Sequence, residues 1–165
     1  MDESWMIEFI EQSLHRMHEN TARIGKCLDQ LTEKEVWLRP NLSSNSVGNL
    51  MLHLCGNIRQ YAVSSLGNLP DTRTRDAEFQ ATEGFDKKQL LQLLTDTIKV
   101  AEVIIQTSDV ENILQKRTVQ CYNLSGMGII IHVLEHYSYH TGQIAFWTKE
   151  LRNKDLGFYA GKELG

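Results

Sequence analysis

The sequence contains only two prolines, Pro40 and Pro70, among its 165 residues. Because proline interrupts helices, its scarcity leaves long stretches in which helices can run unbroken. Long apolar runs are also lacking, and the most apolar stretch covers only residues 127–133. A membrane-spanning helix needs roughly 20 such residues. We therefore expect a protein that does not associate with membranes.

An excess of charge of one sign is absent too, since 17 basic and 21 acidic residues leave a net charge of −4. A mildly acidic chain does not attract phosphate backbones, so nucleic acid is not an expected partner. The three cysteines, Cys27, Cys55 and Cys121, lie far apart and form no CxxC pair. The chain also shows no basic-then-apolar leader. These features favour free thiols in a reducing compartment, and we expect a cytoplasmic protein.

Four segments carry apolar residues at helical spacing. They cover approximately residues 5–31, 46–66, 86–106 and 125–151. Ser46 and Ser125 suit the N-caps of the second and fourth segments, and Asp86 with Gln89 forms a capping-box pattern at the third. No strand pattern competes with these helices, although residues 117–120 are rich in β-branched side chains and suit an extended segment.

These elements predict an all-α protein, a four-helix bundle formed by a single domain over residues 1–165. The connection between the second and third helices, residues 68–85, is long for a compact domain. Ten extended residues cover roughly 30 Å, so this connection is able to run the length of the bundle. The length of this connection therefore permits helices two and three to lie parallel, but it does not require that arrangement.

Two histidines lie on one face of the fourth helix. With Ile129 at zero and about 100° per residue, His136 falls near 340° and His140 near 20°. Both lie in the middle of the apolar stripe that contains Val133 and Ile144. Residues four apart are one turn above each other, which is the spacing by which a helix offers two nitrogens to one metal ion.

The spacing alone leaves two interpretations open: a metal site, or core histidines satisfied by ordinary hydrogen bonds. His53 lies on the flank of the inward face of the second helix, where it is able to supply a third nitrogen. His132 falls near 300°, at the edge of the stripe, so we expect it beside the site rather than in it. A di-iron site is not expected, because the sequence lacks paired Glu-x-x-His motifs.

Two segments resemble a known family. Residues 45–57 (NSVGNLMLHLCGN) and 132–144 (HVLEHYSYHTGQI) are similar to the DinB/YfiT-like superfamily of bacterial metalloenzymes, in which an earlier His-Leu-x-x-Asn precedes His-x-x-x-His-x-Gly-Gln-Ile. The stretches 70–79 and 155–159 resemble an uncharacterised branch of that superfamily. The resemblance covers nearly the whole chain.

The resemblance implies a four-helix bundle in up-down-down-up order, often as a homodimer. It also implies one divalent metal ion held by three histidines, which correspond to His53, His136 and His140 here. Neutral imidazole suits Zn, Ni and Fe alike, so the sequence does not select the metal. Some members of the superfamily use low-molecular-weight thiols.

We therefore expect a metal-binding protein and favour a metal-dependent transferase of bacterial stress or detoxification. Its partners would be a small-molecule thiol and an electrophile. Arg59, Arg73 and Arg75 are candidates for binding carboxylates of such a thiol. Asn57 and Gln143 are candidates for orienting a ligand or a water molecule. The alternative for each is ordinary surface charge or a polar contact between helices.

Two other functions remain open. A metal-dependent hydrolase also needs a general base, and Glu135, the nearest acidic residue, falls near 240° and points away from the histidine face. A non-catalytic binding or stress-response module would use the ion only to join helices. In that case a protein group such as Cys121 would occupy the fourth coordination position.

Overall fold

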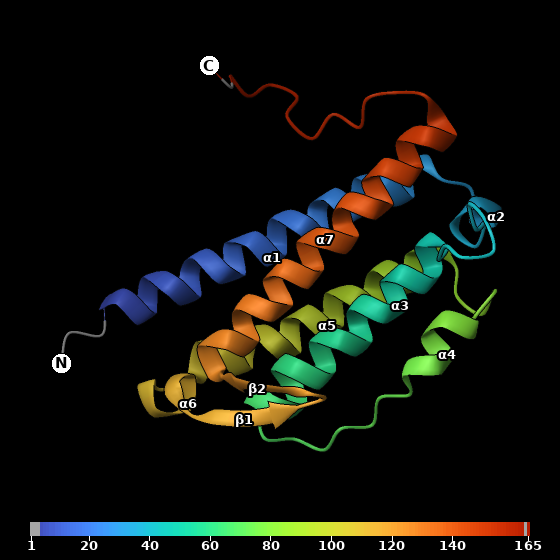
Figure 1. Ribbon diagram of the computed structural model, residues 1–165. Helices are drawn as coiled ribbons and strands as arrows, with labels where there is room; N and C mark the ends of the chain where they lie inside the picture. Colours follow the sequence, from blue (N-terminus) through green and yellow to red (C-terminus); the bar gives the residue numbers. More distant parts are fainter. Residues whose placement is uncertain (1–3, 164) are drawn as a thin grey trace.

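Four long helices form a bundle in this computed structural model, which describes residues 4–163 and 165 (Figure 1). Residues 1–3 and 164 of the expected domain lie outside the described part. The long helices are α1 (Ser4–Gln30), α3 (Val47–Ile58) continued by η1 (Arg59–Leu66), α5 (Lys87–Thr107) and α7 (Gly126–Arg152). α1 and α7 run in one direction, and α3 and α5 run in the other. The predicted all-α bundle with up-down-down-up order is confirmed.

The helices begin where the capping patterns indicate. Ser46, Asp86 and Ser125 each accept a hydrogen bond from the backbone N–H three residues on, at 3.1, 2.7 and 3.1 Å. The short helix α2 (Glu33–Val36) begins in the same way at Thr32. Each cap satisfies a backbone donor that the helix itself leaves unpaired, which is why these boundaries are readable from the sequence.

The second long helix changes its winding after Ile58. The predicted helix does reach Leu66, but its last eight residues, η1, form a π-helix. The winding is recognised by hydrogen bonds between residues five apart, such as the bond that Leu69 N–H donates to the Ser64 carbonyl at 3.0 Å. A π-helix is rare and is frequently found beside functional sites.

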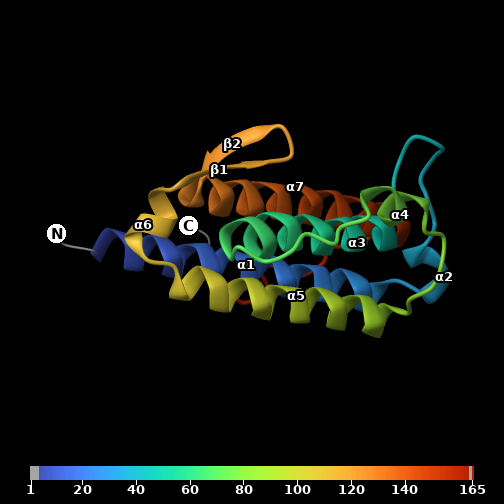
Figure 2. The ribbon, with the colours of Figure 1, turned by 90° about the horizontal axis from the view of Figure 1, so that it is seen from below.

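The crossover between η1 and α5 returns along the bundle and carries a short helix, α4 (Arg75–Gln80) (Figure 2). The sequence interpretation treated this segment as a polar connection, because six residues are too few to show a helical period. α4 packs against α3. The Asn49 side-chain amide donates to the backbone carbonyls of Glu78 (2.9 Å) and Ala81 (2.7 Å), so α3 itself holds the crossover in place.

A second short helix and a hairpin join α5 to α7. They are α6 (Val110–Leu114), β1 (Lys116–Val119) and β2 (Tyr122–Ser125), and the strands pair antiparallel with Val119 opposite Tyr122. The extended segment predicted at 117–120 is confirmed as far as Val119, after which Gln120 turns the chain at a φ of 53°. The hairpin lies against η1 and the beginning of α7.

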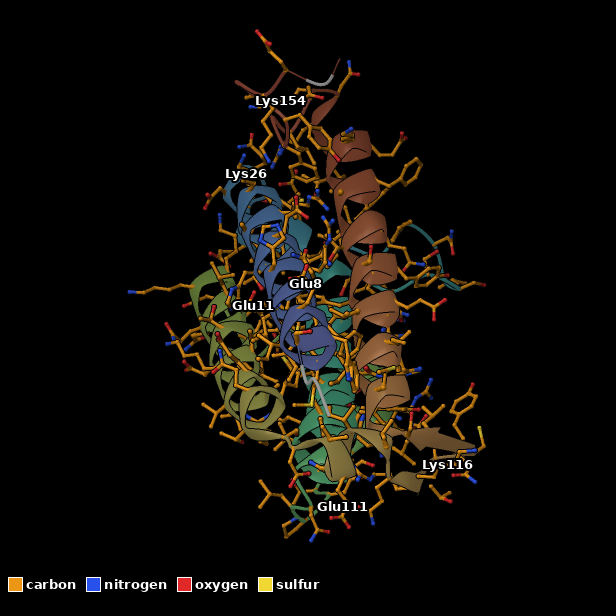
Figure 3. The ribbon with its side chains drawn as sticks, turned by 90° about the vertical axis from the view of Figure 1, so that its left-hand side faces the viewer. Glu8, Glu11, Lys26, Glu111, Lys116 and Lys154 are labelled. Carbon is orange, nitrogen blue, oxygen red and sulfur yellow. The ribbon has the colours of Figure 1, made fainter. Side chains whose placement is uncertain are left out.

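Charged side chains lie on the outside of the bundle. Glu8 and Glu11 of α1 are exposed, as are Glu111 of α6 and Lys116 of β1, which Figure 3 shows at the edge of the molecule. The interior is filled by aliphatic side chains together with Tyr61 and Tyr137. In the described part of the chain, no helix combines the length and apolar character needed to cross a membrane.

Gly126 and Gly128 provide a matched test of how α6 packs on α7. A Cβ at position 126 would meet the Asn112 carbonyl oxygen at 2.5 Å, whereas at position 128 the nearest atom would be 3.5 Å away. We expect Gly126→Ala to lower the free energy of unfolding by about 1–3 kcal/mol through overpacking. Gly128→Ala should be neutral or stabilising by up to about 1 kcal/mol, since alanine favours helix. Urea denaturation measures both, and a Gly126→Ala variant as stable as wild type would contradict this packing.

Candidate metal centre

His53, His136 and His140 meet where α3 packs on α7. One ring nitrogen from each histidine lies within 4.8 Å of the other two. Nε2 of His53 and Nε2 of His136 are 2.9 Å apart. The His140 ring centroid lies 5.0 Å from that of His53 and 4.4 Å from that of His136. The structure thus brings together the three histidines that the sequence singled out.

His53 is held on its outer side by a carboxylate. Its Nδ1 lies 2.9 Å from Oε2 of Glu78, and Arg73 donates to both carboxylate oxygens, from Nε at 2.7 Å and from Nη2 at 2.8 Å. Nη2 of Arg73 also lies 3.1 Å from Nδ1, but two donors do not bond to each other, so the carboxylate is the acceptor for both. Nδ1 therefore carries the proton, and the lone pair on Nε2 faces the other histidines.

The Glu78 carboxylate is charged in this environment. Burial raises its pKa, but the hydrogen bonds from Arg73 and His53 outweigh burial and leave the pKa below its usual value. Its approach to α3 requires Gly56, because a Cβ there would lie 1.9 Å from Oε1 of Glu78. The sequence analysis missed Glu78, whose segment shows no periodicity. The one available signal was Gly56, a helix-interior glycine that marks a close approach.

His140 and His136 are neutral imidazoles. Nδ1 of His140 donates to Oε1 of Gln143 at 2.7 Å, which leaves its Nε2 unprotonated. Burial, together with the neighbouring His140 and His53, lowers the pKa of His136 to about 3. Burial also lowers the pKa of His140. Both rings are therefore uncharged near neutral pH, which is the form that binds metal ions.

This arrangement fits a divalent ion. Two nitrogens bound at about 2.0–2.1 Å in tetrahedral geometry lie roughly 3.3 Å apart, close to the 2.9 Å between His53 and His136. His53 and His140 each donate the N–H that faces away from the group to an oxygen acceptor, as metal-binding histidines do. Within the described chain, only these three side chains make up the group; neither Cys55 nor Cys121 belongs to it. The three histidines can therefore hold a metal ion, and the described residues add no further histidine, cysteine or carboxylate to the group.

His132 lies beside the three histidines, as expected. Its ring stacks on Tyr61, with centroids 4.0 Å apart, and lies 5.7 Å from the His136 ring. Nδ2 of Asn57 donates to Nε2 of His132 at 3.4 Å, while Oδ1 of Asn57 is buried with no hydrogen-bond partner among residues 4–163 and 165. Asn57 thus contacts a neighbour of the group rather than the group itself.

The three candidate arginines lie around the outer side of His53. Arg73 is nearly buried and engaged with Glu78. The guanidinium of Arg75 lies 4.8 Å from the centre of the Phe79 ring, which in turn packs on His53. Arg59 lines a hollow of about 340 Å³ on the same side. Of these guanidinium groups, that of Arg73 has a clear role here, which is to hold the Glu78 carboxylate.

A small hollow of about 180 Å³ opens beside the histidines and is lined by His132, Glu135, His136 and Tyr139. Glu135 lies off the histidine face, in agreement with the helical geometry, and it also lines this hollow. The Glu135 side chain is exposed but lies on the helix surface between His132 and Tyr139, one turn away on either side. Glu135 and His136 thus line the same hollow.

The chain belongs to a family described as a protein of unknown function, DUF1572, which matches residues 4–160. No curated protein matches it. Among solved structures, the chain is similar to YjoA, a DinB-like protein of Bacillus subtilis, with a TM-score of 0.66 and 14% identity over 87% of this chain and 94% of that chain. Likeness at this identity shows the fold alone. The resemblance to the DinB/YfiT-like superfamily is confirmed at that level.

Gly56→Ala tests the contact between Glu78 and His53. The new Cβ would displace the carboxylate, so we expect His53 to lose its single Nδ1–H tautomer and show both tautomers by imidazole ¹⁵N NMR. Gly142→Ala is the control, because a Cβ there meets no atom within 4 Å. An unchanged His53 spectrum in Gly56→Ala would show that Glu78 does not set this tautomer.

Proposed function

We propose that His53, His136 and His140 bind one divalent metal ion and that the protein is a metal-dependent enzyme. The observation that carries this proposal is the convergence of three histidine nitrogens, with no further histidine, cysteine or carboxylate of the described residues in the group. Structural sites close the fourth position with a protein group, whereas catalytic sites keep it open. An ion held there supplies Lewis acidity, which lowers the pKa of a thiol or a water molecule bound at the open position.

The surrounding residues support this use of the site. Glu78 and Gln143 each accept the remote N–H of one imidazole, at 2.9 and 2.7 Å, and so fix its tautomer and orientation. Arg73 keeps the Glu78 carboxylate charged. A carboxylate on a histidine also raises the basicity of its other nitrogen, which strengthens that nitrogen as a ligand.

For the reaction, we propose transfer of a low-molecular-weight thiol to an electrophile. The support is the resemblance to thiol-using members of the superfamily, together with the hollow that opens at His136. Deprotonating the thiol is the part of the reaction that this site suits, because the thiolate is the nucleophile.

A second candidate is hydrolysis, which the position of Glu135 favours. This carboxylate shares the hollow with His136, where it is placed to accept a proton from a water molecule. A purely structural role for the ion is the third possibility, and it would require a fourth protein ligand.

Single substitutions of the three histidines test the metal site. We expect His53→Ala, His136→Ala and His140→Ala each to reduce bound metal to background by elemental analysis, because two imidazoles hold an ion far more weakly than three. His132→Ala is the matched control and should keep one ion per chain. Circular dichroism would verify that all four variants remain helical. Full metal content in any of the first three would show that the substituted residue is not a ligand.

The thiol reaction is tested with metal-loaded protein, a chromogenic electrophile, and bacillithiol, mycothiol, glutathione or coenzyme A. We expect a rate above background with at least one thiol, and its loss on chelation. Glu135→Gln separates the two reactions: it should leave thiol transfer intact but abolish turnover of ester probes by a hydrolase. If no thiol reacts and esters are cleaved only with Glu135 present, the protein is a hydrolase.

A further inference from the structure

A larger hollow of about 660 Å³ lies between the segment 40–47 and the second half of α7. We call it the loop–α7 pocket. Its apolar lining comes from Val47, Leu50, Tyr139, Phe146 and Trp147. Its volume lies within the range of roughly 300–1,000 Å³ that is typical of small-molecule sites. It has the size and the apolar walls of a substrate pocket.

The loop–α7 pocket adjoins the three histidines. Gln143 lines it and accepts the hydrogen bond from His140. The Tyr139 ring lies 5.0 Å from the His140 ring, and Tyr139 lines both this pocket and the small hollow at His136. Tyr139 therefore borders both the loop–α7 pocket and the hollow where His136 is accessible.

The charges of the pocket select against anions. Its polar lining consists of neutral groups from Asn41 to Asn45 and of Gln143, and among the described residues that line it only Glu150 is charged at neutral pH. A carboxylate or phosphate would find no cationic partner there and would be repelled by Glu150. An uncharged molecule needs no cationic partner and is not repelled by Glu150.

Trp147 contributes apolar surface to the pocket. Its Nε1 is buried, with no hydrogen-bond acceptor among the described residues, and has no surface open to the pocket. Trp147 therefore presents its apolar ring to a ligand and not its N–H.

We propose that the loop–α7 pocket binds an uncharged, apolar molecule, and that this molecule is the electrophilic substrate. The assignment as electrophile rests on the proposed function. Binding in the pocket does not, since none of its lining residues is one of the three histidines. The reactive end of the molecule passes Tyr139 to reach the hollow at His136.

The test uses two matched fluorescent probes, 7-diethylaminocoumarin and its 3-carboxylate, titrated into the intact protein. We expect the uncharged coumarin to bind at least tenfold more tightly than the carboxylate. Gly142 lines the pocket with open space around its Cα, so Gly142→Leu should obstruct the pocket without a clash and weaken coumarin binding at least tenfold.

Ser138→Leu is the control, because it adds the same side chain to α7 at an exposed residue that does not line the pocket. It should bind coumarin like wild type. Equal binding by Gly142→Leu, equal or tighter binding of the carboxylate, or no binding of coumarin would each overturn the proposal. So would coumarin binding that decreases as the protein dimerises in sedimentation experiments, since a second copy would then occupy the pocket.

Elemental analysis of the same samples distinguishes the two proposals. Coumarin binding with the expected Gly142→Leu effect, in a protein whose histidine variants retain metal, would support the pocket and refute the metal site. Normal metal content without coumarin binding would do the reverse.

Discussion

The contact of the Glu78 carboxylate with Arg73 and His53 is the interaction on which the arrangement of this molecule depends. Glu78 and Arg73 bury charged groups, with side chains 9% and 3% exposed, and such burial is costly unless every charge is paired. Here the carboxylate accepts three hydrogen bonds, so the cost is offset. Removal of either partner would leave an uncompensated buried charge, which typically destabilises a protein strongly.

This contact links the crossover to the core. α4 reaches α3 only because Gly56 leaves room for the carboxylate and because Asn49 binds the backbone of the crossover at Glu78 and Ala81. The same contact fixes the tautomer of His53. The Glu78 contact therefore has two effects: it holds the crossover against α3, and it orients the His53 ring inside the bundle.

Some features of the site were predictable from local pattern. His136 and His140 are one turn apart on a helix, and the pairing of two residues on one face follows from helical geometry alone. The caps at Ser46, Asp86 and Ser125 are equally local. Glu78 was not predictable, because its partner His53 is 25 residues away and the segment between them has no period. Helical geometry placed Glu135 off the histidine face, where it is exposed, but a helical wheel does not show that Glu135 lines a surface hollow together with His136.

The sequence by itself determined the helices, their caps and the pair of histidines on α7, since all of these depend on residues close together in the chain. Only the tertiary structure decided the direction of α5, the π-helical winding of η1, the approach of Glu78 to His53 and the pocket between segment 40–47 and α7. The direction of α5, the approach of Glu78 to His53 and the pocket depend on contacts between segments distant in sequence, and such contacts are set by how the elements pack. The winding of η1 is local, but the spacing of apolar residues did not distinguish it from an α-helix. The three histidines depend on both: helical spacing places His136 and His140 on one face of α7, and the packing of α3 on α7 brings His53 to them.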